Sequence, residues 1–150
     1  MDMLKMKKIL ALCALCIALL TACNSGDKVD TDNITGIAIE KLDSDEKSIV
    51  RTELAGEDVA AISEILSTQV ISEDKGFVFA EGMYRIELQY ADKSVNLYPY
   101  CGNAETIRYG DDRAAYMKLD ENDKEELEAV IEKYIDITGG IWDWEEYEDN

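Results

Sequence analysis

The sequence predicts an α+β domain over residues 34–137, with an antiparallel sheet of five or six strands and two helices packed on one face. Segments in which apolar and polar residues alternate occur in neighbouring pairs, which is typical of antiparallel hairpins. Two other segments repeat their apolar residues at helical spacing. Strands and helices do not alternate regularly along the chain, as a parallel sheet would require. A length of 150 residues with 47% apolar content suffices for one domain.

The first half of the predicted domain contains a hairpin followed by a helix. Alternating residues predict a strand over 34–42, polar residues predict a turn over 43–47, and a second apolar segment predicts a strand over 49–54. The segment 57–67 is expected to be a helix, because apolar residues recur on one face and acidic residues occupy its first turn. The residues of this apolar stripe are Val59, Ile62 and Leu66.

The clearest β pattern lies over residues 84–90, where four apolar residues alternate strictly with polar ones. Asp92 and Lys93 predict a turn, and the segment 95–100 predicts the second strand of this hairpin. Pro99 has no backbone N–H to donate to a neighbouring strand. We therefore expect it at the end of the strand or at a sheet edge.

Two shorter strands and a second helix complete the predicted domain. The strands are expected over 105–109 and 114–119, on either side of a turn that contains Gly110. The helix is expected to begin after Asp120, which is a favourable N-cap, and to end before Gly139. Its predicted apolar stripe consists of Leu127, Val130, Ile131 and Tyr134.

The N-terminus has the pattern of a secretory signal. Three lysines within residues 5–8 precede an uncharged apolar run over 9–20, which is shorter than the about 20 residues of a membrane-spanning helix. The run leads into Leu20-Thr21-Ala22-Cys23, which resembles the lipobox of bacterial lipoproteins. The resemblance implies cleavage between Ala22 and Cys23 and a diacylglycerol thioether on Cys23. The alternative is an ordinary secretory signal with an incidental cysteine.

This resemblance divides the chain into a signal peptide (1–22), a lipidated cysteine with a flexible tether (23–33), the domain and an acidic, aromatic tail (138–150). It implies an extracytoplasmic protein that is anchored to the cell membrane by its N-terminal lipid. In its order of elements and placement of tyrosines, the domain resembles small single-domain bacterial lipoproteins of unknown function. That second resemblance implies no activity. With Cys23 lipidated, Cys101 would be the single thiol of the mature chain.

Charge and composition exclude several classes of function. Without residues 1–22 the chain holds 32 acidic and 12 basic residues, a net charge of −20. This balance excludes nucleic-acid binding through a basic surface. The chain contains no histidine, so Ser–His and Cys–His catalysis and imidazole zinc sites are also excluded. We assign no residue as catalytic, metal-binding or cofactor-binding.

Aromatic residues provide the candidate binding surface. Tyr98 and Tyr100 are expected on one face of their strand, where they either pack across strands or form a ligand platform. Trp142 and Trp144 lie among acids in the tail. These tryptophans either fold back onto the core or form a strip that contacts a partner, since aromatics are enriched at interfaces.

The sequence therefore predicts a lipid-anchored, extracytoplasmic, non-enzymatic domain that binds a protein, a peptide or a cell-envelope ligand. An acidic domain favours a basic partner. The alternative function is an accessory or inhibitor subunit of an envelope enzyme or transporter. The third is a hydrolase that uses two carboxylates, since two Asp or Glu at the right separation suffice. With 32 acids, however, chance pairs are certain and most should be solvated. The mature domain is expected to be monomeric and to carry no cofactor.

Overall fold

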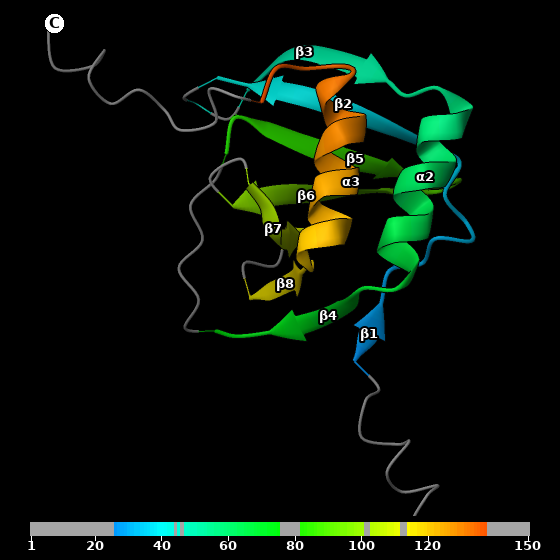
Figure 1. Ribbon diagram of the computed structural model, residues 1–150, viewed down its shortest axis with the longest axis vertical. Coiled ribbons are helices and arrows are strands. Elements are labelled where there is room, and N and C mark those ends of the chain that lie inside the picture. The colour runs from blue at the N-terminus through cyan, green and yellow to red at the C-terminus, as the bar shows by residue number, and fades with distance from the viewer. Residues whose placement is uncertain are drawn as a thin grey trace, which may run out of the picture.

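A single antiparallel sheet carries both helices of the described chain on one of its faces (Figure 1). The computed structural model describes residues 26–43, 45, 47–75, 82–100, 103–111 and 114–137. The strands are β1 (Asp27–Lys28), β2 (Gly36–Leu42), β3 (Ser48–Glu53), β4 (Val70–Glu73), β5 (Tyr84–Gln89), β6 (Ser94–Tyr100), β7 (Asn103–Tyr109) and β8 (Ala115–Lys118). The helices are α2 (Gly56–Ser67) and α3 (Glu121–Glu132). The strand order is β1-β4-β8-β7-β6-β5-β2-β3, so β1 and β3 form the two edges.

The α+β class, the antiparallel sheet and the two helices on one face are confirmed. The expected number of five or six strands is wrong, since the described sheet has eight. One additional strand is β4, which follows α2 and pairs with β8. The other is β1, which lies inside the segment 23–33 that we expected to be a flexible tether. Both are too short to show a clear alternation in the sequence.

The segment around β1 is attached to the domain at several points. Asp27 pairs with Ile71 and Lys28 pairs with Val70 of β4. The next residue, Val29, is buried in the hydrophobic core. Further along, the backbone carbonyl of Asp30 accepts a hydrogen bond of 2.8 Å from the Tyr90 hydroxyl. The chain is therefore part of the fold from β1 onward.

Pro99 occupies the first of its two expected positions, the end of a strand. Pro99 lies near the end of β6, and the register with β7 shifts immediately after it. However, β6 lies between β5 and β7 rather than at a sheet edge. The register shift interrupts the hydrogen bonds between β6 and β7 next to Pro99, which has no N–H to donate. An interior strand can therefore accommodate this proline.

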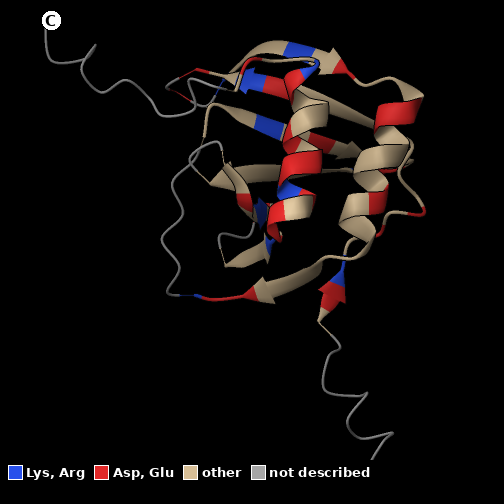
Figure 2. Cartoon of the chain, viewed as in Figure 1, with Lys and Arg blue, Asp and Glu red and all other residues tan. Residues whose placement is uncertain are grey.

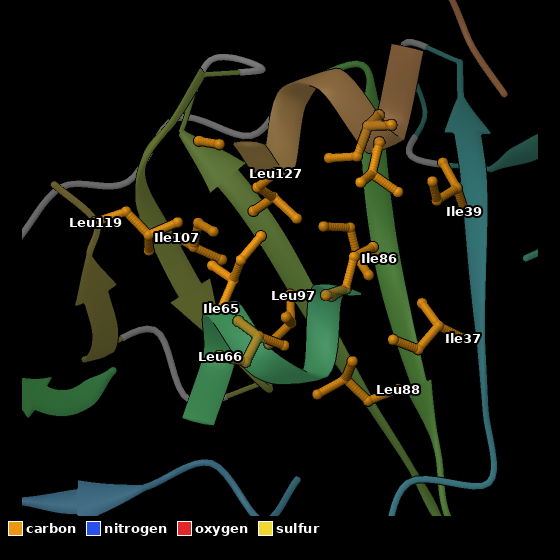
Figure 3. Close-up of a cluster of buried hydrophobic side chains, with 14 of the residues drawn as sticks. Ile37, Ile39, Ile65, Leu66, Ile86, Leu88, Leu97, Ile107, Leu119 and Leu127 are labelled. Carbon is orange, nitrogen blue, oxygen red and sulfur yellow. The ribbon is translucent and has the colours of Figure 1, made fainter. Parts of the chain in front are cut away.

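The hydrophobic core fills the space between the sheet and the two helices (Figure 3). Alternate residues of the central strands point toward the helices, as the period of two requires. The largest fully buried side chains of the strands are those of Ile37, Ile39, Tyr84, Ile86, Leu88, Leu97, Ile107 and Met117. The helices contribute Ile62, Ile65, Leu66, Leu127, Val130 and Ile131. Both predicted helical stripes therefore face the sheet.

The predicted N-cap of the second helix is confirmed. The Asp120 carboxylate accepts a hydrogen bond of 2.8 Å from the backbone N–H of Asp123, which satisfies one of the free donors of the first turn. The helix ends at Glu132, so Tyr134 of the predicted stripe lies just beyond it. No helix among the described residues is both long and apolar enough to cross a membrane.

Candidate functional site

The sheet face opposite the helices carries a row of polar side chains, which we call the polar sheet face. No described helix covers this face (Figure 1). In the strand register, Glu40 of β2 pairs with Arg51 of β3 on one side and Arg85 of β5 on the other. The row continues where Tyr98 of β6 pairs with Arg108 of β7. These three arginines are all of those in the described residues.

Carboxylates neutralise Arg51 and Arg85 at close range. Arg51 donates from Nη1 to Glu40 Oε1 at 2.7 Å and from Nη2 to Glu53 Oε1 at 2.8 Å. It also forms a bidentate pair with Glu87 at 2.9 and 3.0 Å. Arg85 Nε donates to the second oxygen of Glu40 at 2.7 Å. Glu40 is only 4% exposed, so these two guanidinium groups, rather than water, neutralise its charge.

The ionisation of this network reflects its pairing. The hydrogen bonds that Arg51 donates to Glu87 and Glu40 raise the pKa of its guanidinium above the ordinary value. In turn, the Arg51 guanidinium lowers the pKa of the Glu87 carboxyl. Both groups therefore stay charged together. The charged side chains of this part of the polar sheet face therefore form ion pairs with one another. These ion pairs link β3, β2 and β5.

The predicted tyrosine surface has one buried and one exposed member. Tyr98 is 8% exposed, and the Arg108 guanidinium lies 4.0 Å from the centre of its ring. Tyr100 is 37% exposed and lies past the register shift of β6. The structure therefore does not bring the two rings together as one exposed platform. The cleavage and lipidation residues Ala22 and Cys23 lie outside the described residues, as do Trp142 and Trp144.

A second surface lies between the two helices, and we call it the interhelical groove. Its volume is about 510 Å³. From the α2 side it is lined by Ala61, Glu64, Ile65 and Thr68, and from the α3 side by Asp123, Glu126, Ala129, Val130 and Lys133. Ile65 and Val130 are mostly buried and form an apolar floor, whereas Glu64 and Glu126 are exposed on the rim.

The rim of the interhelical groove keeps a negative charge. The two helices together hold nine acidic residues and one lysine. In Figure 2 the charged parts of both helices are mainly red. No described lysine or arginine forms an ion pair with Glu64 or Glu126. The cation that lines the groove, Lys133, is bound at 2.7 Å to Asp58. The groove therefore combines an apolar floor with carboxylates that are available to a cationic ligand.

A polar latch, made by Asp58, Lys133 and Tyr134, joins the first turn of α2 to the end of α3. The two oxygens of the buried Asp58 carboxylate accept from Lys133 Nζ and from the Tyr134 hydroxyl. The same hydroxyl accepts a hydrogen bond of 3.0 Å from the backbone N–H of Ala55. Lys133 first, and Tyr134 second, lower the pKa of Asp58 below its ordinary value of 3.8. The latch fixes the spacing of the helices that form the groove.

The latch predicts an acid-dependent loss of stability. A carboxyl whose pKa is lowered in the folded state contributes stability above its unfolded pKa, and that contribution disappears as the pH falls through the folded value. We expect Asp58→Asn to be less stable than the wild type at neutral pH. Below pH 3.8 the difference in the free energy of unfolding between Asp58→Asn and the wild type should become smaller. Urea unfolding between neutral and strongly acidic pH measures both effects.

The matched control is Asp92→Asn, which changes an exposed aspartate in the turn between β5 and β6. The free energy of unfolding of Asp92→Asn should depend on pH in the same way as that of the wild type. Glu87 has a lowered pKa of its own, so Asp58→Asn should retain part of the acid dependence. A constant difference between Asp58→Asn and the wild type at every pH would contradict the ionised latch.

The sequence did not identify the interhelical groove. Each helical stripe predicts which residues face the sheet, but a groove depends on the distance between two helices. The useful signal was the pair of alanines, Ala61 and Ala129, beside the apolar stripes, since small residues leave space between helices. Among the described residues, no group of three or more His, Cys, Asp or Glu side chains is arranged to hold a metal ion.

Comparisons with protein-family models, curated proteins and solved structures gave no match to this chain. Its function is therefore inferred from its own residues and their arrangement.

Proposed function

We propose that this chain is a lipid-anchored, extracytoplasmic, non-enzymatic domain whose interhelical groove binds a basic, partly apolar segment of a partner protein. The observation that carries the proposal is the apolar floor of the groove beneath two exposed rim carboxylates, Glu64 and Glu126, that form no ion pair with a described lysine or arginine. A helix or an extended segment with apolar residues on one side and Lys or Arg beside them complements both features.

Charge pairing favours the groove over the polar sheet face as the binding surface. Around Glu40 the carboxylates and guanidinium groups already neutralise one another, so a ligand would have to break existing ion pairs. In the groove, a cationic ligand would gain new pairs with Glu64 and Glu126 without such a loss. The net charge of −20 for residues 23–150 would also steer a basic partner toward the domain.

The proposed anchor is the lipid on Cys23. Two or three acyl chains bind a bilayer durably, since each buried CH₂ contributes about 0.8 kcal/mol. Mass spectrometry of the membrane fraction should find an acylated N-terminus at Cys23. Replacing this cysteine by alanine should leave the precursor uncleaved by the lipoprotein peptidase. Recovery of the unmodified protein from the culture medium would contradict the anchor.

Site-specific photo-crosslinking in the producing cell tests the groove. A benzophenone amino acid replaces Ala129, which is exposed and lines the groove. The control variant carries the same amino acid at Ala60, which is exposed on α2 and does not line the groove. We expect a crosslinked partner from the Ala129 position alone. Mass spectrometry should locate the crosslink in a segment with a net positive charge.

The charge of the rim is tested in the same Ala129 crosslinking background. Each exposed ion pair contributes about 0.2–1 kcal/mol, so the double variant Glu64→Gln, Glu126→Gln should weaken crosslinking by roughly two- to thirtyfold. Three results would contradict the proposal: equal crosslinking from Ala60, no effect of the double variant, or an acidic crosslinked segment. A crosslink to a subunit of an envelope enzyme or transporter would identify the domain as an accessory subunit.

A further inference from the structure

The segment next to the proposed lipid anchor is built into one edge of the sheet. Three residues lie between Cys23 and Asp27, where β1 begins, so the chain advances by four residues from one to the other. A fully extended chain spans at most about 3.6 Å per residue, so the start of β1 lies within roughly 14 Å of Cys23. The predicted tether of eleven residues would have allowed the domain to rotate freely. The observed β1 removes most of that freedom.

The attachment of this segment extends well beyond the two paired residues of β1. Val29 is 5% exposed within the core, and Tyr90 holds the carbonyl of Asp30. The backbone N–H of Thr35 then donates to the carbonyl of Gln89 at 2.8 Å before β2 begins. These contacts join the segment to β4 and to the turn between β5 and β6. The segment that follows Cys23 is therefore held against the domain at both β4 and the end of β5.

The strand order places the other edge far from the anchor. Seven strand intervals separate β1 from β3. At about 4.8 Å per interval, the two edges are up to roughly 34 Å apart, less any shortening by sheet twist. Helix α2 begins directly after β3 and ends directly before β4, so it runs across the sheet between its two ends (Figure 1). The interhelical groove follows the same direction.

We propose that the β1 edge of the sheet faces the lipid bilayer and that the β3 edge points away from it. The inference rests on the lipid anchor of the proposed function. The surface that meets the bilayer is the β1–β4 edge, where the 40%-exposed Val70 supplies an apolar side chain at the headgroup level. In this orientation the interhelical groove runs away from the membrane surface, with its Thr68 end near the bilayer and its Lys133 end far from it.

Contact quenching on vesicles tests this orientation. Lipidated protein that carries Cys101→Ser is labelled with a fluorophore at Ser72→Cys on β4 or at Ser48→Cys on β3, both of which are exposed serines. The protein is bound to phosphatidylcholine vesicles whose headgroups carry nitroxides, which quench only at short range. We expect severalfold stronger quenching at position 72 than at position 48.

A lengthened tether supplies the control. Inserting about ten Gly and Ser residues after Asn24 adds a flexible reach of roughly 16–19 Å, so the difference in quenching between the two labels should largely disappear. Equal quenching in the original chain, or stronger quenching at position 48, would overturn the orientation while leaving the anchor intact. If the lipidated protein fails to float with the vesicles, the anchor itself is wrong, and the orientation falls with it.

Discussion

Replacing Leu97 by alanine is expected to lower the free energy of unfolding by about 2–5 kcal/mol, the cost of removing a buried leucine side chain and leaving a cavity. Leu97 is fully buried on β6, where it pairs with Ile86 of β5 and Tyr109 of β7. It lies beneath α2, close to Ile65 and Leu66 (Figure 3). Well-packed neighbours on all sides restrict any collapse into the space that the substitution creates.

Urea unfolding followed by circular dichroism measures this effect. Val50→Ala is the control, because Val50 on the edge strand β3 is 48% exposed and leaves no enclosed cavity. It should change the free energy of unfolding by no more than about 0.5 kcal/mol. The urea midpoint of Leu97→Ala should be lower than that of the wild type. The slope of the free energy of unfolding against urea concentration should stay the same. If Leu97→Ala is as stable as Val50→Ala, the proposed core is incorrect.

Replacing Glu40 by glutamine is expected to have the second-largest effect, about 1–3 kcal/mol of lost stability. The neutral amide has almost the same shape but cannot neutralise the guanidinium groups of Arg51 and Arg85. Those two cations then face each other across the position that the carboxylate held. The loss should be smaller than for a fully buried ion pair, because Arg51 and Arg85 remain 38% and 24% exposed.

Glu53→Gln is the matched control for this prediction. Its carboxylate also binds Arg51, at 2.8 Å, but its side chain is 59% exposed. An exposed ion pair contributes only about 0–1 kcal/mol, so this variant should remain close to the wild type. High salt should reduce the small effect of Glu53→Gln more than the effect of Glu40→Gln. Equal losses from the two substitutions would show that burial of Glu40 does not matter.

The long elements could be predicted from the sequence because each has a regular period. The strict alternation over 84–90 gave both the strand and its buried face, and Asp120 gave the start of the last helix. The missed strands lack such signals. β4 has four residues and β1 has two, Asp27 and Lys28, whose charges are typical of a loop. Only their partners, brought close by the rest of the fold, make them strands.

The surfaces were harder to predict than the elements. Alternation places Glu40 on the polar side of its strand, which suggests an exposed residue. Its burial depends on Arg51 and Arg85, which reach it from two other strands. The same limit applies to Tyr98, which becomes buried because Arg108 of β7 covers its ring. Local periodicity identifies the face on which a side chain lies, but only the strand order identifies its neighbours.

The strand order also has a consequence for how the chain folds. Four of the seven pairings join strands that follow one another in sequence: β2–β3, β5–β6, β6–β7 and β7–β8. The other three close long loops, the shortest separations being 42 residues, as from Lys28 to Val70. Hairpins form in about 1–10 μs, whereas non-local pairing costs loop entropy before it gains contacts. We therefore expect folding in milliseconds to seconds, with hairpins formed early and the β1–β4 edge closed late.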